Sequence, residues 1–429
     1  MPKAVISNRI FIELPDRELR EEIKKKLTYI IPSSIKNMPP ITIRNMSPVK
    51  GDIFSIPAGR IDLIPENYEI VDKRTKIEAE FPLFEGTLRK SQQELWDIVE
   101  DSCIINAWVS FGKTFTALAI AGKLGQKTLV VTHNTGLRTQ WVKEVQKVYG
   151  ITPGIIGSGK FDISTPIVIG NVQTLYNKIP EIYNKFGLIL IDEMHHSSAA
   201  TFNKILDKST ARYKIGLSGT IRRKDGKHVI FKDFFGDKLY QPPPENFMTP
   251  TIHIIKSGIK LIDGEIPWAT KMNKLAYNEN YQHSVALTAC AYAAKGHKVL
   301  VVSDRVDFLQ NCAELSGSNA ICVTGAIKDQ SERESFLKSV ATGDKDILYG
   351  TQSIFSEGIS LNELSCLILA TPINNESLLE QLIGRVIRKC PNKLDPVIVD
   401  INLLGKTASN QARNRLAVYI KKGWKVVNL

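Results

Sequence analysis

Residues 107–114 read Ala-Trp-Val-Ser-Phe-Gly-Lys-Thr, and they stand between an apolar run and a helical pattern. The run at 103–106, Cys-Ile-Ile-Asn, has the composition of a buried strand, and residues 115–121 have that of a helix. A strand, a loop that ends in Gly-Lys-Thr and a helix surround a phosphate chain with backbone N–H groups and a helix N-terminus. The sequence therefore predicts a phosphate-binding loop, in which Lys113 binds the β- and γ-phosphates and Thr114 binds Mg²⁺.

Two positions in this loop differ from the commonest phosphate-loop pattern. Ala107 stands at the place of the first glycine, and Ser110 stands where many such loops carry another glycine. We expect Ala107, Ser110 and Gly112 to line the phosphates together with Lys113 and Thr114. A chance occurrence of Gly-Lys-Thr is disfavoured, because a strand and a helix flank it in the order that the site requires.

A second chemical signal follows in residues 188–196, Leu-Ile-Leu-Ile-Asp-Glu-Met-His-His. The apolar run predicts a buried strand that delivers two carboxylates at its C-terminal end. Asp192 can hold Mg²⁺, and Glu193 can orient and deprotonate the water that attacks a γ-phosphate. The alternative, in which the pair only caps a strand end, is disfavoured by the phosphate loop upstream. His195 and His196 have no cysteine or acidic partner at the spacing of zinc ligands.

The remaining sequence predicts three domains. Residues 1–85 mix short apolar stretches with Pro and Gly turns and contain one charged helix near residues 16–27, which predicts a small strand-rich domain. In residues 86–245 and again in 246–429, apolar runs alternate with helical patterns, as expected of parallel sheets covered on both faces by helices. Three prolines at 242–244 interrupt the pattern and place an interdomain connection there. The fold class is therefore α/β.

Composition narrows the class of protein further. The net charge of +12 and the pI of about 9.2 favour a polyanionic partner, although charge alone does not identify it. The six cysteines are scattered without a C-x-x-C pair, which argues against a disulfide framework or a zinc site. The N-terminus has no signal-peptide pattern, and no run reaches the roughly 18 apolar residues that a membrane span needs. We therefore expect a cytoplasmic protein without a membrane partner.

The phosphate loop and the Asp-Glu pair resemble motifs I and II of the superfamily 2 helicases. Further motifs of that family follow in its order, so that the resemblance covers residues 86–400. It implies two tandem RecA-like motor domains that bind ATP with Mg²⁺, and in helicases of this kind Ala is the usual first residue of the loop. It also implies ATP contacts at Gln92, upstream of the loop, and at Gly358, in the second domain.

The same resemblance implies how ATP hydrolysis is coupled to a nucleic acid. His195 of motif II and Ser218 and Thr220 of motif III are identified as coupling residues. The positions identified with nucleic-acid contact are His133, Asn134, Gln173, Thr174, Arg223 and Thr351.

Residues 381–388, Gln-Leu-Ile-Gly-Arg-Val-Ile-Arg, resemble motif VI of the family. Gln381, Arg385 and Arg388 are spaced by four and three residues, so on a continuous helix they share one face. The resemblance implies that this face supplies arginines to the charge that develops on the γ-phosphate of ATP. A basic solvated helix is the alternative for an isolated motif of this kind, and the preceding motifs disfavour it.

The segment after motif III is similar to a branch that contains XPB-type helicases, phage UvsW-like helicases and restriction-enzyme motors. XPB-type proteins carry Arg-Glu-Asp where residues 223–225 read Arg-Lys-Asp, and the compact chain is most similar to the UvsW-like helicases, which remodel forks and four-way junctions. We therefore expect a monomeric helicase that unwinds or branch-migrates branched DNA in phage replication, recombination or repair. Two alternatives stay open: a duplex DNA translocase that separates no strands, and an RNA-dependent ATPase.

Overall fold

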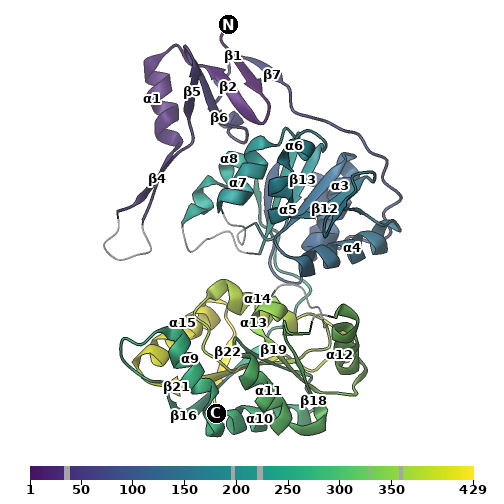
Figure 1. Cartoon of the computed structure of the whole chain (residues 1–429), viewed down its shortest axis with the longest axis vertical. Helices are drawn as coiled ribbons and strands as arrows, with labels where there is room; N and C mark the ends of the chain where they lie inside the picture. Colours follow the sequence, from purple (N-terminus) through teal and green to yellow (C-terminus); the bar gives the residue numbers. More distant parts are fainter. Residues whose placement is uncertain (33–38, 195–198, 220–225, 328, 357–360) are drawn as a thin grey trace. The chain divides into compact units, whose positions relative to one another are not determined.

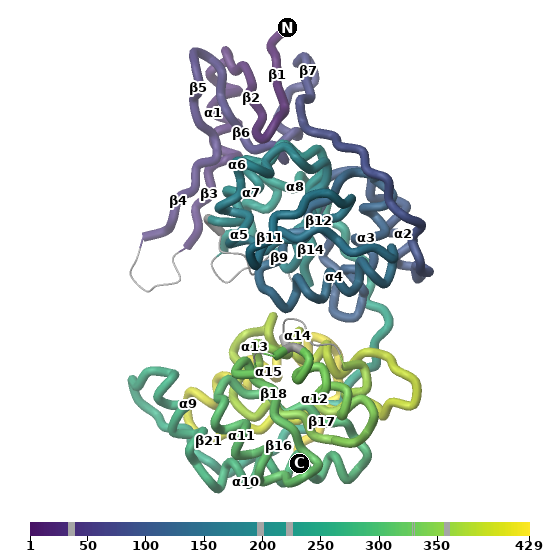
Figure 2. The backbone as a smooth tube through the Cα atoms, turned by 45° about the vertical axis from the view of Figure 1, so that its right-hand side comes forward, coloured from purple at the N-terminus to yellow at the C-terminus, as the bar shows by residue number. Residues whose placement is uncertain are grey.

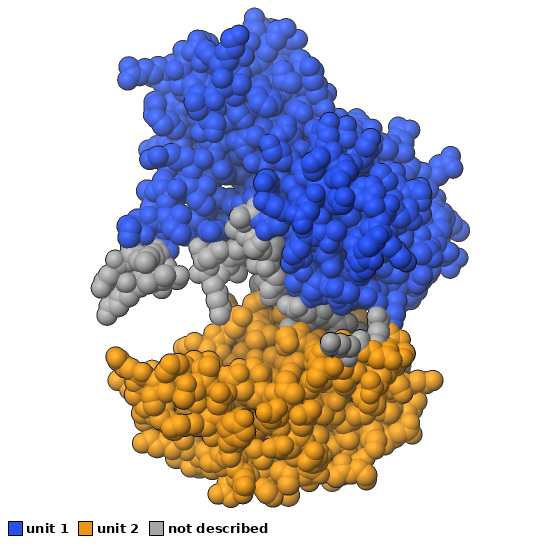
Figure 3. All heavy atoms as spheres, in the orientation of Figure 1, with its two compact units in different colours: residues 1–244 blue, residues 245–429 orange. Residues whose placement is uncertain are grey.

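The chain divides into two compact units, Met1–Pro244 and Glu245–Leu429 (Figure 3). The structure is a computed structural model, and it describes all residues of the chain except 33–38, 195–198, 220–225, 328 and 357–360. The prolines at 242–244 stand at the end of the first unit, where a residue without a backbone N–H cannot extend the neighbouring sheet. The two units are described separately below.

A five-stranded sheet opens the first unit, in the order β5-β6-β2-β1-β7 (Figure 1). Its strands are β1 (Lys3–Ile6), β2 (Arg9–Glu13), β5 (Ser47–Lys50), β6 (Ile53–Pro57) and β7 (Glu69–Asp72). The charged helix α1 (Arg17–Lys26) packs on it through Ile23, which is buried against Ile10 and Ile12. Asp16 begins this helix, because its side chain accepts a hydrogen bond from the backbone N–H of Glu18 at 2.8 Å.

A separate hairpin, β3 (Thr28–Ile31) with β4 (Ile41–Arg44), extends away from that sheet (Figures 1 and 2). Residues along each strand alternate between two faces. One face carries Tyr29 and Ile43, which pair with each other and pack on the core of the following domain. The other face carries Ile30, whose side chain is 69% exposed. The hairpin therefore uses one face to hold the neighbouring domain and leaves the other open.

The larger sheet of the first unit has the order β11-β10-β12-β9-β13-β14-β8-β15, and all its pairings are parallel except that of β11 with β10. Its strands are β8 (Cys103–Asn106), β9 (Thr128–Thr132), β10 (Gly154–Gly157), β11 (Lys160–Phe161), β12 (Ile167–Asn171), β13 (Leu188–Ile191), β14 (Tyr213–Ser218) and β15 (Leu239–Tyr240). Its helices are α2 (Lys90–Ile98), α3 (Lys113–Leu124), α4 (Thr135–Tyr149), α5 (Val172–Asn177), α6 (Ile179–Ile182), α7 (Ala199–Lys208) and α8 (Lys232–Phe235).

Helices cover both faces of this sheet because its central strands are apolar on both faces. In β9, Val130 belongs to the core under α3 and α4, whereas Leu129 and Val131 belong to the core under α5, α7 and α8. Such continuous apolar strands are typical of parallel sheets buried on both sides. The predicted α/β architecture with parallel sheets is confirmed in this unit.

The second unit contains a seven-stranded sheet whose pairings are all parallel, in the order β18-β19-β17-β20-β21-β16-β22. Its strands are β16 (Thr251–Lys260), β17 (Val299–Ser303), β18 (Ala320–Val323), β19 (Ile347–Thr351), β20 (Cys366–Leu369), β21 (Val397–Leu404) and β22 (Lys425–Asn428). Its helices are α9 (Trp268–Ala276), α10 (Glu279–Ala294), α11 (Val306–Leu315), α12 (Gln330–Thr342), α13 (Gln352–Ser356), α14 (Glu376–Val386) and α15 (Lys406–Lys421). It too matches the predicted parallel α/β architecture.

Within the first unit, a cluster around Asp233 joins the small sheet and hairpin to the larger domain. Asp233 lies on α8 and is fully buried. Its carboxylate accepts hydrogen bonds from the Tyr29 hydroxyl at 2.7 Å and from Nδ2 of Asn45 at 2.5 Å, and Nη1 of Arg60 lies at 3.5 Å. The backbone N–H of Gly59 also donates to the Asp233 carbonyl at 2.9 Å. A buried carboxyl group is tolerated here because residues from the N-terminal domain surround it with hydrogen-bond donors.

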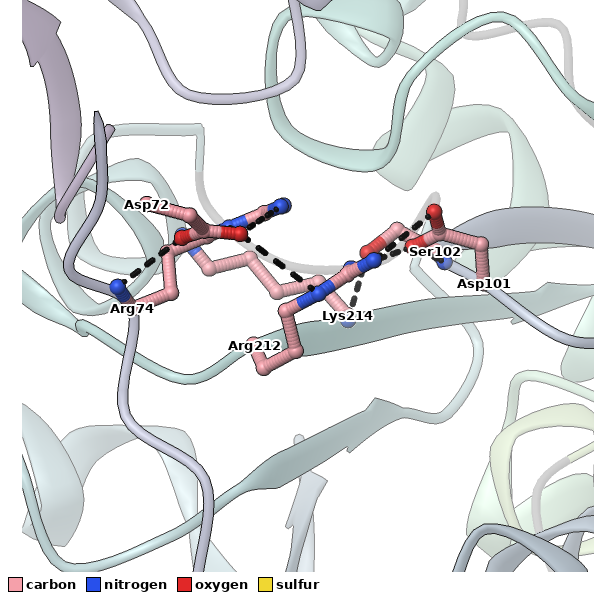
Figure 4. A network of polar contacts seen from close by, with 6 residues as sticks. All are labelled: Asp72, Arg74, Asp101, Ser102, Arg212 and Lys214. Atoms are coloured by element: carbon pink, nitrogen blue, oxygen red, sulfur yellow. Dashed lines mark hydrogen bonds and ion pairs between the residues drawn. The ribbon is translucent and has the colours of Figure 1, made fainter. Parts of the chain in front are cut away.

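A second polar joint lies where the chain leaves β7 (Figure 4). Arg74 binds Asp72 through Nε and Nη2, and Arg212 binds Asp101 through both terminal nitrogens, with its Nε 3.8 Å from Asp72. The buried Lys214 on β14 donates from Nζ to a main-chain carbonyl of α7 at 2.9 Å. A pocket of about 300 Å³ adjoins these residues. Both clusters join the larger domain to the N-terminal segment, and Arg9 adds an ion pair to Asp207 at 2.9 Å.

Candidate functional site

The predicted site residues of the first unit gather at one edge of its parallel sheet. The strands β8, β9, β12, β13 and β14 run parallel, so their carboxyl ends meet at the same edge. The phosphate loop follows β8, the Asp-Glu pair follows β13, and Ser218 ends β14. In open α/β sheets, ligands bind outside the carboxyl ends of the strands. The site therefore occupies the edge where this architecture places ligands.

The backbone of the phosphate loop explains its glycine. Gly112 has a φ of +83° and directly precedes α3, which begins at Lys113. A Cβ atom at Gly112 would lie 2.8 Å from Nε2 of Gln92, so a side chain there would displace the Gln92 amide and would also be strained at this positive φ. Ser110 has a φ of +68°, a left-handed conformation that costs free energy in a residue with a Cβ atom. The loop thus aims the N-terminus of α3 at the sheet edge through a strained turn.

Lys113 lies close to the second carboxylate of motif II. Its Nζ atom is 3.8 Å from Oε1 of Glu193 and donates to the Ala107 carbonyl at 3.3 Å. Glu193 has a φ of +45°, which is uncommon for a residue other than glycine. Strain of this kind is typical of functional sites, where surrounding contacts hold the residue in place. The loop cation and the carboxylate predicted to act on water therefore face the same small volume.

Asp192 is buried, with 5% of its surface exposed, and two N–H donors hold its carboxylate. Oδ1 accepts from the backbone N–H of Glu193 at 2.9 Å, and Oδ2 accepts from Nε1 of Trp141 at 2.7 Å. Burial raises the pKa of Asp192 above its usual range, and the adjacent Glu193 charge acts in the same direction. A nearby cation would offset both effects, because it favours the ionised carboxylate.

The residues at this edge fit a nucleotide with Mg²⁺. Asn106 Oδ1 and Ser110 Oγ are buried beside the loop, and neither has a hydrogen-bond partner among the described residues. The hydroxyl of Thr114 and the carboxylate of Asp192 are hard oxygen ligands of the kind that Mg²⁺ prefers. Lys113 and the N-terminus of α3 would hold the phosphates. These roles remain predictions for the individual residues.

Gln92 lies against the phosphate loop, and its amide binds main-chain groups at both ends. Oε1 accepts from the backbone N–H of Arg89 at 3.0 Å, and Nε2 donates to the Phe111 carbonyl at 2.6 Å. The Arg89 guanidinium also donates to the Phe111 carbonyl. Through these two hydrogen bonds Gln92 links the start of α2 to the phosphate loop. Its contact with the adenine of ATP stays a prediction. Sequence reasoning missed Arg89, which has no motif signal.

Four of the residues predicted to contact nucleic acid also lie at the sheet edge. His133 and Asn134 follow β9, and Gln173 and Thr174 stand in α5 after the neighbouring strand β12. Asn134 begins α4, because its Oδ1 accepts from the backbone N–H of Leu137 at 2.8 Å, and its Nδ2 lies 3.1 Å from Nε2 of His133. The structure brings the two pairs to adjacent strand ends, which a single backbone segment of nucleic acid could follow.

In the second unit, motif VI differs from the predicted geometry. Gln381 and Arg385 lie on α14, but this helix ends at Val386 and Arg388 is not part of it. Arg388 instead pairs in a β-bridge with Phe247, and the backbone N–H of Met248 donates to the carbonyl after Val386 at 2.7 Å. The prediction that three motif VI residues share one helix face was therefore wrong. Pairing with residues 246–248 draws the chain out of the helix.

The structure describes some of the other predicted positions of the second unit and of the coupling motifs, and their roles stay predictions. Thr351 ends β19 and is 8% exposed, and Gln352 beside it donates to Thr371 at 3.2 Å. Ser218 is fully buried, and its carbonyl accepts from the backbone N–H of Ala107 at 3.0 Å, so motif III contacts the start of the phosphate loop. The predictions for His195, Thr220, Arg223 and Gly358 fall outside the described residues.

Two known families match the motor region of the chain. Residues 85–223 match the family described as "Type III restriction enzyme, res subunit", and residues 282–390 match "Helicase conserved C-terminal domain". The chain is 43% identical over 435 residues to "Probable helicase D10" of Escherichia phage T5, which covers 100% of this chain and 96% of that protein. It is 24% identical over 331 residues to "ATP-dependent DNA helicase uvsW" of Enterobacteria phage T4, covering 70% of this chain and 64% of that one.

A solved structure shares the fold at low identity. Dbp5 of Saccharomyces cerevisiae, bound to RNA and ADP BeF3, superposes with a TM-score of 0.56 and 12% identity, covering 79% of this chain and 89% of that one. Parallel sheets that carry a phosphate loop are typical of nucleotide-binding domains. The chain belongs to the superfamily 2 helicases and is an ATP-dependent helicase, as its full-length similarity to the phage T5 protein shows. No helix among the described residues is long and apolar enough to cross a membrane.

Proposed function

We propose that the protein unwinds or branch-migrates branched DNA, such as forks and four-way junctions, in phage replication, recombination or repair. The observation that carries this proposal is the N-terminal domain, which is bound to the motor domain through the buried Asp233 cluster. A motor contacts phosphates, and phosphate contacts do not distinguish a junction from a linear duplex. A second surface fixed to the motor supplies the additional contact that a branch point requires.

The choice of DNA is supported by the printed name of one relative, whereas charge supports a nucleic acid without distinguishing DNA from RNA. The phage T4 relative is by its printed name a DNA helicase. The net charge of +12 favours a polyanion of either kind. We propose DNA as the partner, a monomer as the working form, and the cytoplasm of the host cell as the place of action.

The proposed catalytic roles are supported in the first unit by the proximity of Lys113 and Glu193 and in the second unit by the resemblance to motif VI. Lys113 binds the phosphates, Thr114 and Asp192 hold Mg²⁺, and Glu193 orients the attacking water and accepts its proton. Mg²⁺, when bound, would neutralise charge on the β- and γ-phosphates. Arg385 of the second unit supplies positive charge to the transition state, since a guanidinium matches the geometry of phosphate oxygens.

The deciding experiment compares ATP hydrolysis and strand displacement on four substrates: single-stranded DNA, linear duplex, four-way junction DNA and RNA. The proposal expects the highest turnover on the junction, together with release of strands from it. Hydrolysis on duplex without strand release would identify a double-stranded DNA translocase instead. Stimulation by RNA alone would identify an RNA-dependent ATPase and would exclude the DNA role.

A further inference from the structure

Trp141 binds the carboxylate that is proposed to hold Mg²⁺. It lies on α4 with no exposed surface, and its indole Nε1 donates to Oδ2 of Asp192 at 2.7 Å. The two residues are 51 positions apart in the chain, so the contact depends on how α4 packs on the sheet. Buried indole N–H groups usually find a hydrogen-bond partner, and here the partner is a buried carboxylate.

The chemistry of an indole suits this position. Trp has one donor, no acceptor and no charge, so it orients a carboxylate without competing for the cation. With the backbone N–H of Glu193 on Oδ1, each carboxylate oxygen of Asp192 accepts one hydrogen bond. The remaining lone pairs of Asp192 are therefore directed by two rigid donors. Donors of this kind commonly tune the affinity of a metal ligand from outside the coordination shell.

Helix α4 also connects this contact to the predicted nucleic-acid surface. Asn134 caps its first turn, and Trp141 stands seven residues later, a distance of about 10 Å along a helix with a rise of 1.5 Å per residue. The helix is held in the core by Val145, Val148 and Trp141 itself, which are fully buried. Residues 135–149 form one continuous helix. For this reason, a nucleic acid that displaces the start of α4 would also move the indole N–H relative to Asp192.

We propose that Trp141 is a positioning residue that orients Asp192 for Mg²⁺ and transmits nucleic-acid contact at the start of α4 to the ATP site. The proposal rests on the proposed ATP-dependent function of this site and adds a residue to it. Trp141 touches neither substrate nor reacting atoms, so its effect is exerted through Asp192.

The test replaces the donor while keeping an aromatic ring. Trp141→Phe removes the N–H group, and Trp141→His removes more volume but can place Nε2–H where the indole nitrogen lies. Binding of a fluorescent, non-hydrolysable ATP analogue is followed by anisotropy while Mg²⁺ is titrated. Loss of a partner outside the coordination shell typically costs 10- to 100-fold in metal affinity, so the Phe variant should need about that much more Mg²⁺ for half-saturation. The His variant should recover part of the loss, and binding without Mg²⁺ should stay unchanged.

Tyr149→Phe provides the matched control. Tyr149 lies on the same helix in the same core and donates its hydroxyl to the Leu118 carbonyl at 2.7 Å, away from Asp192. Its loss should lower stability toward urea without changing the Mg²⁺ requirement. A second measurement, the ratio of DNA-stimulated to basal ATP hydrolysis, should fall for Trp141→Phe and not for Tyr149→Phe.

The outcomes separate this proposal from the function on which it rests. A Mg²⁺ requirement like that of the parent in Trp141→Phe, or an equal change in Tyr149→Phe, would overturn the positioning role of Trp141 alone. If Trp141→Phe does not fold, Trp141→His decides the same question, because it keeps an N–H donor: a folded His variant that needs about 10-fold or more additional Mg²⁺ would overturn the proposal. A parent protein that binds no ATP analogue at any Mg²⁺ concentration would overturn the ATP site itself.

Discussion

Lys113 and Glu193 make separable contributions to ATP turnover. Lys113→Ala removes the cation that neutralises phosphate charge, so we expect it to weaken both ATP binding and hydrolysis. Glu193→Gln keeps the shape of the side chain and removes the base, so we expect ATP to bind while hydrolysis falls by about 100-fold or more. Nucleotide binding and steady-state hydrolysis on the purified variants measure the two effects. Hydrolysis at the parent rate in either variant would contradict the assignment.

The two arginines of motif VI are expected to behave differently from each other. Arg385 lies on α14, whereas Arg388 lies beyond it in the bridge with Phe247, where burial lowers the pKa of its guanidinium. Arg385→Ala should lower kcat by about 10³-fold, as expected for an arginine that acts in the transition state, with little change in ATP affinity. Arg388→Ala should lower kcat and also reduce resistance to urea.

A lysine substitution at Arg385 shows whether positive charge alone is enough for ATP hydrolysis. Arg385→Lys retains the charge but not the planar fork of donors, so it should recover only part of kcat. Parent-like kcat in Arg385→Ala would show that this arginine does not act on ATP.

The sequence predicted that Lys113 and Glu193 lie close together, but it did not predict which residues hold the site in place. Carboxyl ends of parallel strands meet at one edge, and this rule placed Lys113 and Glu193 together, as the 3.8 Å separation confirms. Their roles stay predictions. Trp141 could not be assigned, because its bond to Asp192 depends on the packing of α4 and not on any local pattern. The sequence offered two signals: Gln140-Trp141 belongs to a stretch that resembles motif Ia of the family, and an indole N–H needs a partner when it is buried.

At the scale of the elements, β14 carries a lysine whose burial makes stability depend on pH. Lys214 is 3% exposed, and burial lowers its pKa to about 8; Arg74 and Arg9 add to this shift and Asp207 opposes it. The folded state therefore releases this proton near pH 8, whereas the unfolded chain keeps it until about pH 10.4. Stability contributed by this group is lowest below pH 8 and increases as the pH rises toward 10.4.

Lys214→Met tests this dependence. The quantity to compare is the free energy of unfolding of the variant minus that of the parent. We expect this difference to be largest at pH 7 and to fall by about 3 kcal/mol by pH 10.4, because the parent gains this stability as the pH rises. Urea unfolding of both proteins across this pH range gives the difference. Lys208→Met, on the exposed end of α7, serves as the control and should show no such trend. A constant difference for Lys214→Met would show that the buried amine does not titrate in this window.

Periodicity predicted the elements better than their ends. Apolar runs predicted the parallel strands, and a charged helix near residues 16–27 is present as α1 (Arg17–Lys26). The end of α14 could not be predicted, because four-and-three spacing is compatible with a helix through Arg388. The bridge to Phe247, which is more than a hundred residues away in the chain, competes with the last helical turn. Long-range pairing of this kind leaves no local signal.

For the whole molecule, the structure changes how the role of the N-terminal domain has to be tested. Deleting residues 1–85 would remove Tyr29, Asn45 and Arg60 from the fully buried Asp233. A buried carboxylate left without its donors is strongly destabilising, by about 3 kcal/mol or more. DNA-binding experiments on the truncated protein would therefore not distinguish loss of DNA selectivity from loss of folding. Substitutions on the exposed face of the domain avoid this problem.

The positions to change are the exposed basic residues Lys25 on α1, Arg44 on the hairpin and Lys50 on β5. Arg44 lies on the hairpin face opposite Tyr29, so its substitution leaves the contact with Asp233 in place. We expect the triple substitution to Glu to weaken binding to a four-way junction more than binding to linear duplex at matched salt, since affinity for phosphates depends steeply on salt. ATP hydrolysis without DNA should stay at the parent level, because none of the three lies at the carboxyl edge of the motor sheet.

The control for this last prediction carries the same change in net charge elsewhere. Lys274, Lys295 and Lys425 are exposed in the second unit, and their triple substitution to Glu lowers the net charge equally. It should reduce affinity for junction and duplex by the same factor, because long-range attraction does not distinguish the two. If the N-terminal variant keeps the full preference of the parent for junctions, selectivity must lie within the motor domains, and the N-terminal domain serves to brace the first of them through Asp233.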